Sequence, residues 1–124
     1  MDGRGVERVI IGASVPNPMV GGIRRRRDGP ISGIILNGPD GNERGGYATA
    51  DHPQGGSLLT LDAGVGGEVF KVFANRDAGA TMSVMHRNGA RGTLTTYRGS
   101  PEFEMVDGNR RRVHAIPQNM PPLR

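Results

Sequence analysis

The chain lacks cysteine and tryptophan, and its 124 residues include only three phenylalanines and two tyrosines. Without cysteine, disulfide bonds, thiolate catalysis and cysteine-ligated metal sites are excluded. With few large side chains and a hydrophobic fraction of 35%, the chain can build one domain with a thin core. We expect such a protein to complete its burial in an oligomer.

Long hydrophobic runs are missing too. No stretch is long enough to span a bilayer, and the N-terminus carries no hydrophobic signal segment. We therefore expect no membrane association and, by default, a cytoplasmic protein, with an extracellular location as the open alternative.

Helical periodicity is absent, and the chain shows instead a series of short β-branched runs between turn residues. The 21 glycines and 9 prolines mark the breaks, and residues 14–22 are expected to form an extended loop. The predicted strands cover residues 6–11, 32–36, 46–50, 57–62, 68–74, 81–86, 92–98, 102–106 and 110–116. The pattern predicts an all-β fold, an antiparallel meander of about eight or nine short strands arranged like a barrel, a prism or a sandwich, with little or no helix. We assign residues 1–116 to a single β domain and residues 117–124 to a proline-rich C-terminal tail.

Alternation within the strands predicts which side chains are buried. Residues 68–74 form the most apolar run and are expected at the centre of the core, buried on both faces. In residues 102–106, Phe103 and Met105 are expected to point inward and the glutamates between them outward. The strand at 6–11 has no hairpin partner before it. We expect that partner to come from another subunit or from sequence missing at this end.

A hairpin corner recurs as an Asp-Gly or Asn-Gly pair followed by an arginine that heads a new strand. It occurs at residues 2–8, 40–44, 88–91 and 107–110, and residues 37–46 are predicted as a hairpin loop. Tight hairpins need positive φ, which Asn, Asp and Gly adopt at least cost. Consecutive glycines inside a strand also indicate a bulge or a closely packed backbone, which a neighbouring chain would supply. The glycines assigned to these structural roles are Gly41, Gly45, Gly46, Gly89 and Gly108.

Positive charge comes almost entirely from arginine. The net charge is +4, with fifteen arginines and one lysine. A GC-rich genome that uses arginine at solvated positions explains this, and so does contact with phosphate. Four adjacent residues, Arg24, Arg25, Arg26 and Arg27, are the candidates for anion or nucleic-acid contact, although only two of them would share a face in a strand.

The corner at 37–46 also carries the candidate ligand site. Glu43 and Arg44 would either form a buried ion pair that fixes the corner or place a general base beside an arginine clamp for a small anionic substrate. Tyr47 and His52 follow them in the chain and complete the candidate pocket. The three histidines show no metal-ligand spacing, and the glycine-rich residues 63–67 lack a nucleotide-binding motif. We assign no catalytic residue, metal or cofactor.

Several stretches resemble a family of small, uncharacterised bacterial β-rich proteins. The resemblance rests on residues 8–11, the loop prolines Pro16 and Pro18, residues 33–37 and above all the Gly-Asn-Glu-Arg-Gly-Gly-Tyr stretch at 41–47. In that family a Gly-x-Glu-x-Gly-Gly element accompanies repeated Asp-Gly corners followed by arginine. The resemblance implies a β-hairpin architecture and carries no activity.

Together these features predict a non-enzymatic structural or assembly protein that forms a homo-oligomer, a trimer among the options, through β-hairpin elements. The alternative is a small-molecule or anion-binding module, or a small enzyme, with a pocket near Glu43 and Arg44. Arginine-mediated nucleic-acid binding is the weaker alternative.

Overall fold

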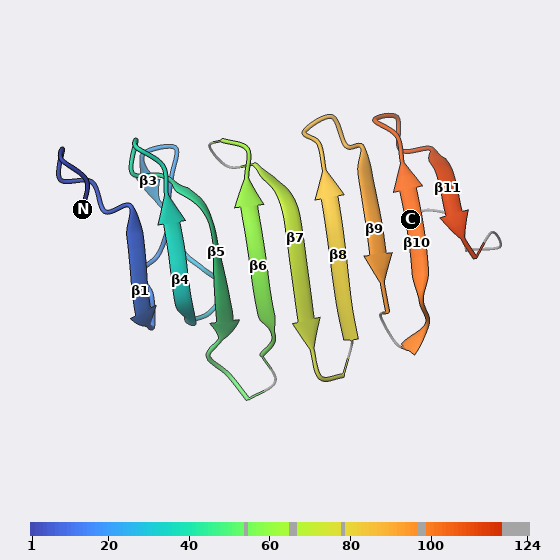
Figure 1. Cartoon of the computed structure of the whole chain (residues 1–124), viewed down its shortest axis with the longest axis horizontal. Helices are drawn as coiled ribbons and strands as arrows, with labels where there is room; N and C mark the ends of the chain where they lie inside the picture. The colour runs from blue at the N-terminus through green and yellow to red at the C-terminus, as the bar shows by residue number, and fades with distance from the viewer. Residues whose placement is uncertain (54, 65–66, 78, 97–98, 118–124) are drawn as a thin grey trace.

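The structure, a computed structural model, describes residues 1–53, 55–64, 67–77, 79–96 and 99–117. Nine strands form one open antiparallel sheet whose order follows the chain (Figure 1). They are β1 (Val9–Ala13), β4 (Ile31–Asn37), β5 (Glu43–Ala50), β6 (Ser57–Asp62), β7 (Glu68–Asn75), β8 (Gly79–Met85), β9 (Arg91–Thr95), β10 (Glu102–Val106) and β11 (Arg112–Ile116). The predicted all-β meander is confirmed. Its outer strands lie at opposite ends, so the sheet is a single layer that is not closed on itself.

The chain leaves this sheet once, between β1 and β4, to form a small hairpin of β2 (Met19–Val20) and β3 (Ile23–Arg24). Gly21 and Gly22 join the two strands with φ of 61° and 75°. Two-residue hairpin turns require this left-handed conformation, which glycine adopts without a steric penalty. The prediction of an extended loop over residues 14–22 was therefore wrong at this turn.

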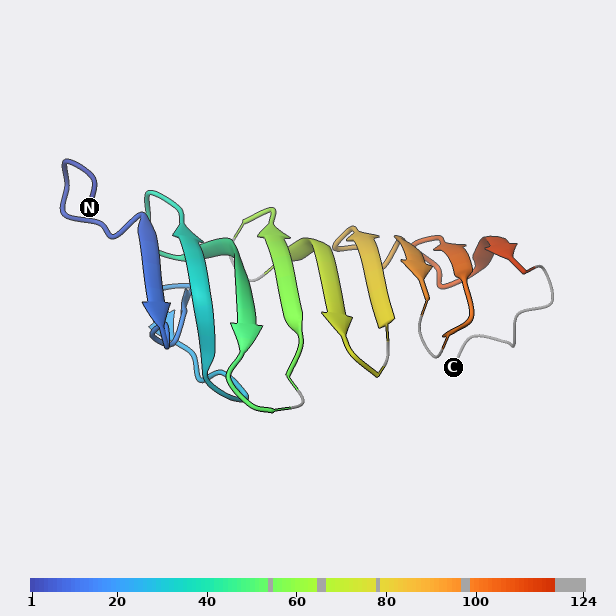
Figure 2. The same ribbon diagram turned by 60° about the horizontal axis from the view of Figure 1, so that its bottom comes forward.

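The hairpin lies against one face of the sheet at its N-terminal end (Figure 2). The backbone N–H of Gly22 donates to Asn42 Oδ1 at 2.8 Å, which ties the hairpin to the corner before β5. Ile35 lies under the hairpin and is 4% exposed. We call this side the covered face. Its middle row of residues is Ile10, Ile35, Gly46, Thr60, Lys71, Ser83, Thr93, Glu104 and Ala115.

Strand positions agree well with the periodicity, while some pairings do not. The predicted bounds of β6 and β10 match the structure. Strand β5 begins at Glu43, earlier than predicted, because the corner uses only residues 38–42. The expectation about the first strand was wrong, since β1 pairs along its length with β4 of the same chain.

Burial also departs from the prediction. Strand β7 is central in the sheet, but its side chains are only partly covered. Met105 is 43% exposed, whereas the Glu104 side chain is only 16% exposed, so the predicted inward and outward directions in β10 were reversed. The buried hydrophobic residues of the described chain are few: Val15, Ile35, Ala48, Val106 and Ala115.

The recurring corners share one backbone turn. In each, the first residue's carbonyl accepts a hydrogen bond from the fourth residue's N–H, and the turns are 2–5, 38–41, 86–89 and 107–110. The fourth residue has positive φ in every case. This position is glycine in three turns and Arg110, with φ of 63°, in the last. Gly108 lies in its turn, at the second position, and Arg110 instead of a glycine takes the left-handed conformation.

Substitutions at the fourth turn position test this geometry, because they should change the free energy of unfolding in opposite directions in two equivalent turns. Gly89→Ala should destabilise the protein by about 1 to 2 kcal/mol, the cost of left-handed backbone for a residue with a Cβ. Arg110→Gly should stabilise it by up to about 1 kcal/mol by relieving that cost. Urea unfolding at fixed protein concentration measures both. Gly3→Ala, where an added Cβ would meet nothing within 4 Å, is the control. Equal losses from both variants would contradict the shared turn geometry.

Candidate functional site

The side of the sheet opposite the covered face carries two rows of residues that run across all nine strands. The register of the strands defines both rows. The first row is Val9, Leu36, Gly45, Leu61, Phe70, Val84, Gly92, Met105 and His114. The second row is Ile11, Ile34, Tyr47, Leu59, Val72, Met82, Leu94, Phe103 and Ile116. We call this surface the apolar face, because neither row contains an acidic side chain, a lysine or an arginine.

The apolar face is open to solvent. Ile11 is 74% exposed, Tyr47 58% and Ile116 56%, and most other members of the two rows are also exposed. A soluble monomer rarely leaves an apolar patch larger than a few hundred Å² uncovered. This face extends across all nine strands, so it is far larger than such a patch and is a candidate interaction surface.

Several polar and charged residues on the covered face, by contrast, have partners. Glu104 accepts from Arg112 Nε at 2.9 Å and lies 3.4 Å from Arg91 Nη2. Thr81 and Thr95 share a hydrogen bond of 2.8 Å between their hydroxyls. Many polar groups on the covered face therefore find partners within the chain, while the apolar face is exposed.

The consecutive glycines of β5 are required by neighbouring backbone. A Cβ on Gly45 would lie 2.2 Å from the carbonyl oxygen of Thr60, and one on Gly46 would lie 2.5 Å from that of Ile34. A register shift between Leu36 and Asn37 accompanies them. The predicted bulge and close approach are present, and the approaching strands are β4 and β6 of the same chain.

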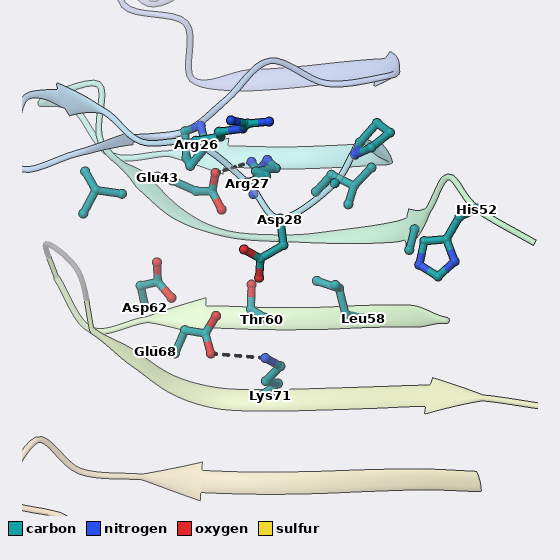
Figure 3. A pocket seen from close by; sticks show the side chains of 16 residues that line it. Arg26, Arg27, Asp28, Glu43, His52, Leu58, Thr60, Asp62, Glu68 and Lys71 are labelled. Atoms are coloured by element: carbon teal, nitrogen blue, oxygen red, sulfur yellow. Dashed lines mark hydrogen bonds and ion pairs between the residues drawn. The ribbon is translucent and has the colours of Figure 1, made fainter. Parts of the chain in front are cut away.

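A second candidate lies on the covered face. A groove of about 800 Å³ runs between residues 26–31 and strands β5 to β7 (Figure 3). Within it, Arg27 Nη2 lies 2.6 Å from Glu43 Oε2, and both side chains are largely buried. Lys71 Nζ lies 3.7 Å from Glu68. The charges of the groove are thus mostly paired.

Asp62 is the carboxylate of the groove that has a buried oxygen without a hydrogen-bond partner among the described residues. That oxygen is Oδ1, and Asp62 stands opposite Glu68 in the register of β6 and β7. Burial raises the pKa of Asp62 above its ordinary value of 3.8. The negative charges of Glu68 and Glu43 raise it further, against a smaller opposing effect of Arg44. No group of three or more His, Asp or Glu in the part of the chain that the structure describes is placed to hold a metal ion.

The residues of the predicted pocket are divided between two faces. Glu43 and His52 line the groove. Arg44 pairs instead with Asp40, at 2.7 Å, so the predicted Glu43–Arg44 ion pair is replaced by two different pairs. Tyr47 lies on the apolar face, on the other side of the sheet.

The arginine run is also divided. Arg24 lies in β3 and donates to the carbonyl oxygen of Asn17, and Arg27 pairs with Glu43. Arg25 and Arg26 are exposed, with no side-chain partner within the described ranges. The four arginines therefore do not present one continuous cationic surface, and nucleic-acid binding stays a prediction.

Sequence reasoning missed most of what lines the groove, including Asp28, Asp62 and Glu68. A signal was present for one pair, because Asp62 and Glu68 bound a hairpin turn and must face each other. It also missed the apolar face as a surface. Laying the predicted strands side by side would have shown its two rows, but not that they are uncovered.

Comparisons with known proteins add no relative: no protein-family model, curated protein or solved structure matches the chain. No described segment is a helix of the length and apolar character needed to cross a membrane. The family resemblance, the C-terminal tail beyond residue 117 and the cellular location stay predictions, and residues 118–124 lie outside the described residues.

Asp62 gives a pH-dependent prediction. Its raised pKa means that the ionised carboxylate is disfavoured in the fold, so the penalty is present at neutral pH and is removed as pH falls through the folded pKa. Asp62→Asn should therefore raise the melting temperature at neutral pH, with a smaller gain at about pH 3.

Asp40 is the matched control with the opposite sign. Hydrogen bonds from Asn42 and Arg44 lower its pKa from 3.8 to about 2. Asp40→Asn should lower the melting temperature at neutral pH, and the loss should shrink as pH falls from 3.8 towards 2. Thermal unfolding of both variants at neutral pH and at about pH 3 checks the two predictions. A stabilising effect of Asp62→Asn that grows in acid would contradict the assignment.

Proposed function

We propose that this protein is a non-enzymatic structural or assembly protein that forms a homo-oligomer by burying its apolar face against other copies of itself. The observation that carries the proposal is the pair of apolar rows across nine strands, left open by every described segment of the chain. Burial of apolar surface is the main favourable term in association. The oligomer would supply the core that the isolated chain lacks.

The size of the face supports this proposal. Nine strands spaced at about 4.8 Å span about 38 Å, and strands of five to eight residues are about 17 to 26 Å long. Each copy thus offers about 650 to 1,000 Å², and two copies together about 1,300 to 2,000 Å². A standard specific interface buries about 1,600 Å² in total.

The chemistry of the face favours another copy over a charged partner. Phosphate recognition needs lysine or arginine, and the two rows contain neither. Obligate homo-oligomers, in contrast, have interfaces that resemble a domain core cut in half. The face of a second copy is apolar over the same extent, so it would leave no unpaired charge at the interface.

The absolute mass in solution, by size-exclusion chromatography with light scattering, tests the proposal. We expect a defined multiple of 13.2 kDa. Leu59→Lys, next to the centre of the second row, should dissociate the oligomer because a buried unpaired charge is costly. Thr93→Lys, on the covered face, is the matched control and should leave the mass unchanged.

A folded 13.2 kDa monomer would overturn the proposal. The groove lined by Glu43 and His52 would then become the leading site, as the predicted ligand-binding alternative requires. An oligomer that both lysine variants dissociate equally would also contradict burial of the apolar face.

A further inference from the structure

We propose that the assembly is a two-fold dimer in which the apolar faces of two copies pack with each strand lying across the same strand of its partner. This inference rests on the proposed function and specifies its geometry. The two-fold axis runs across the strands, between the first and second rows. Each residue of one row then faces the residue two positions away on the partner's equivalent strand.

On two strands of the apolar face, a position without a side chain lies beside a large side chain. We call the first a dimple and the second a protrusion. Two positions of the first row have no side chain, Gly45 on β5 and Gly92 on β9. On each of these strands the second row carries a large side chain, Tyr47 on β5 and Leu94 on β9, and both are about half exposed. A dimple beside a protrusion is self-complementary under a two-fold axis.

Two face-to-face arrangements with a two-fold axis in the plane of the interface keep the strands of the two copies aligned. In the proposed one, Tyr47 fills the space over Gly45 of the other copy, and Leu94 fills the space over Gly92. In the reversed one, with the axis parallel to the strands through the central β7, β5 lies over β9 of the other copy. There Gly45 would face Gly92 and leave a void, while Tyr47 would crowd Leu94. Voids and overpacking are both destabilising, so side-chain size favours the first arrangement.

Gly92 has little reason to be glycine within its own chain. Its φ is not in the left-handed range, and an added Cβ would meet only Val84 Cγ2, at 3.3 Å. By contrast, Gly45 has φ of 139° and no room for a Cβ. The dimple at Gly92 is therefore a feature of the surface that a partner side chain explains.

The width of the sheet favours two copies over the trimer considered from the sequence. Three flat sheets about 38 Å wide, arranged as a triangular prism, would each lie about 11 Å from the axis. Packed sheets are about 10 Å apart, so side chains reach only about 5 Å from each sheet. Such a prism would be hollow at its centre, whereas two aligned sheets fill the space between them.

Exchanging the small and the large residue on β9 tests the proposed contact between Gly92 and Leu94 of the other copy. Gly92→Leu alone should weaken the dimer at least tenfold by overpacking against Leu94 of the other copy. The double variant Gly92→Leu with Leu94→Ala should restore most of the affinity, because the large and small residues still face each other. Thr93→Leu places the same leucine side chain on the covered side of the same strand and should leave dimer affinity unchanged. Sedimentation equilibrium measures all three. Failure of the double variant to recover, with Gly92→Leu dissociated, would overturn the geometry.

Spin labels distinguish the two arrangements directly, since the chain has no cysteine of its own. A label at Val113→Cys, on the outer strand β11, should give an inter-label distance below about 30 Å, because the two β11 strands overlap. The reversed arrangement puts the labels at opposite ends of the assembly, about 40 Å or more apart. A label at Lys71→Cys, on the central β7, should give a similar distance in both and confirms that the labelled protein is dimeric.

The outcomes separate this inference from the proposed function. A monomer by mass would overturn both. A trimer, or a dimer whose Val113 labels lie about 40 Å apart, would overturn the two-fold geometry and leave the proposed function standing. A dimer with short distances at both labels, together with rescue by the exchanged pair, would support it.

Discussion

Backbone pairing across nine consecutive antiparallel strands is the constraint on which the rest of this structure depends. A single-layer sheet has two faces that need covering. Among the described residues, the segment that leaves the sheet and packs on a face is 14–30 (Figure 2). It covers part of one face and none of the other. The few buried hydrophobic residues and the exposed rows of large ones have this single cause.

The distribution of charge follows from the same division. Ion pairs such as Arg27–Glu43 and Arg112–Glu104 lie on the covered face, where side chains are partly desolvated and find partners on neighbouring strands. The apolar face has no such pairs to make, and its remaining interaction is hydrophobic burial. Many groups on the covered face are thus paired within the chain, and the apolar face is exposed.

The groove and the apolar face lie on opposite sides of the sheet, so they are not competing uses of one surface. A face-to-face dimer would leave both grooves, which Glu43, Asp62 and Glu68 line, on the outside of the assembly. Asp62 marks the groove as electrostatically strained, since burial and neighbouring carboxylates both act against its ionised form. Tyr47 lies on the apolar face, although it follows Glu43 closely in the chain.

Local properties of the sequence determined the strands and the corners. Alternation and turn chemistry act over a few residues, which is why β6 and β10 were predicted to the residue. Which side of the sheet is covered was decided only by the tertiary structure, because alternation separates two faces without saying where the rest of the chain packs. Phe103 and Met105 were therefore expected to point into the core, and they lie on the apolar face. The pairing of β1 with β4, and of Glu43 with Arg27 instead of Arg44, was likewise decided there. Both depend on the path of residues 14–30, and nothing local to either partner encodes that path.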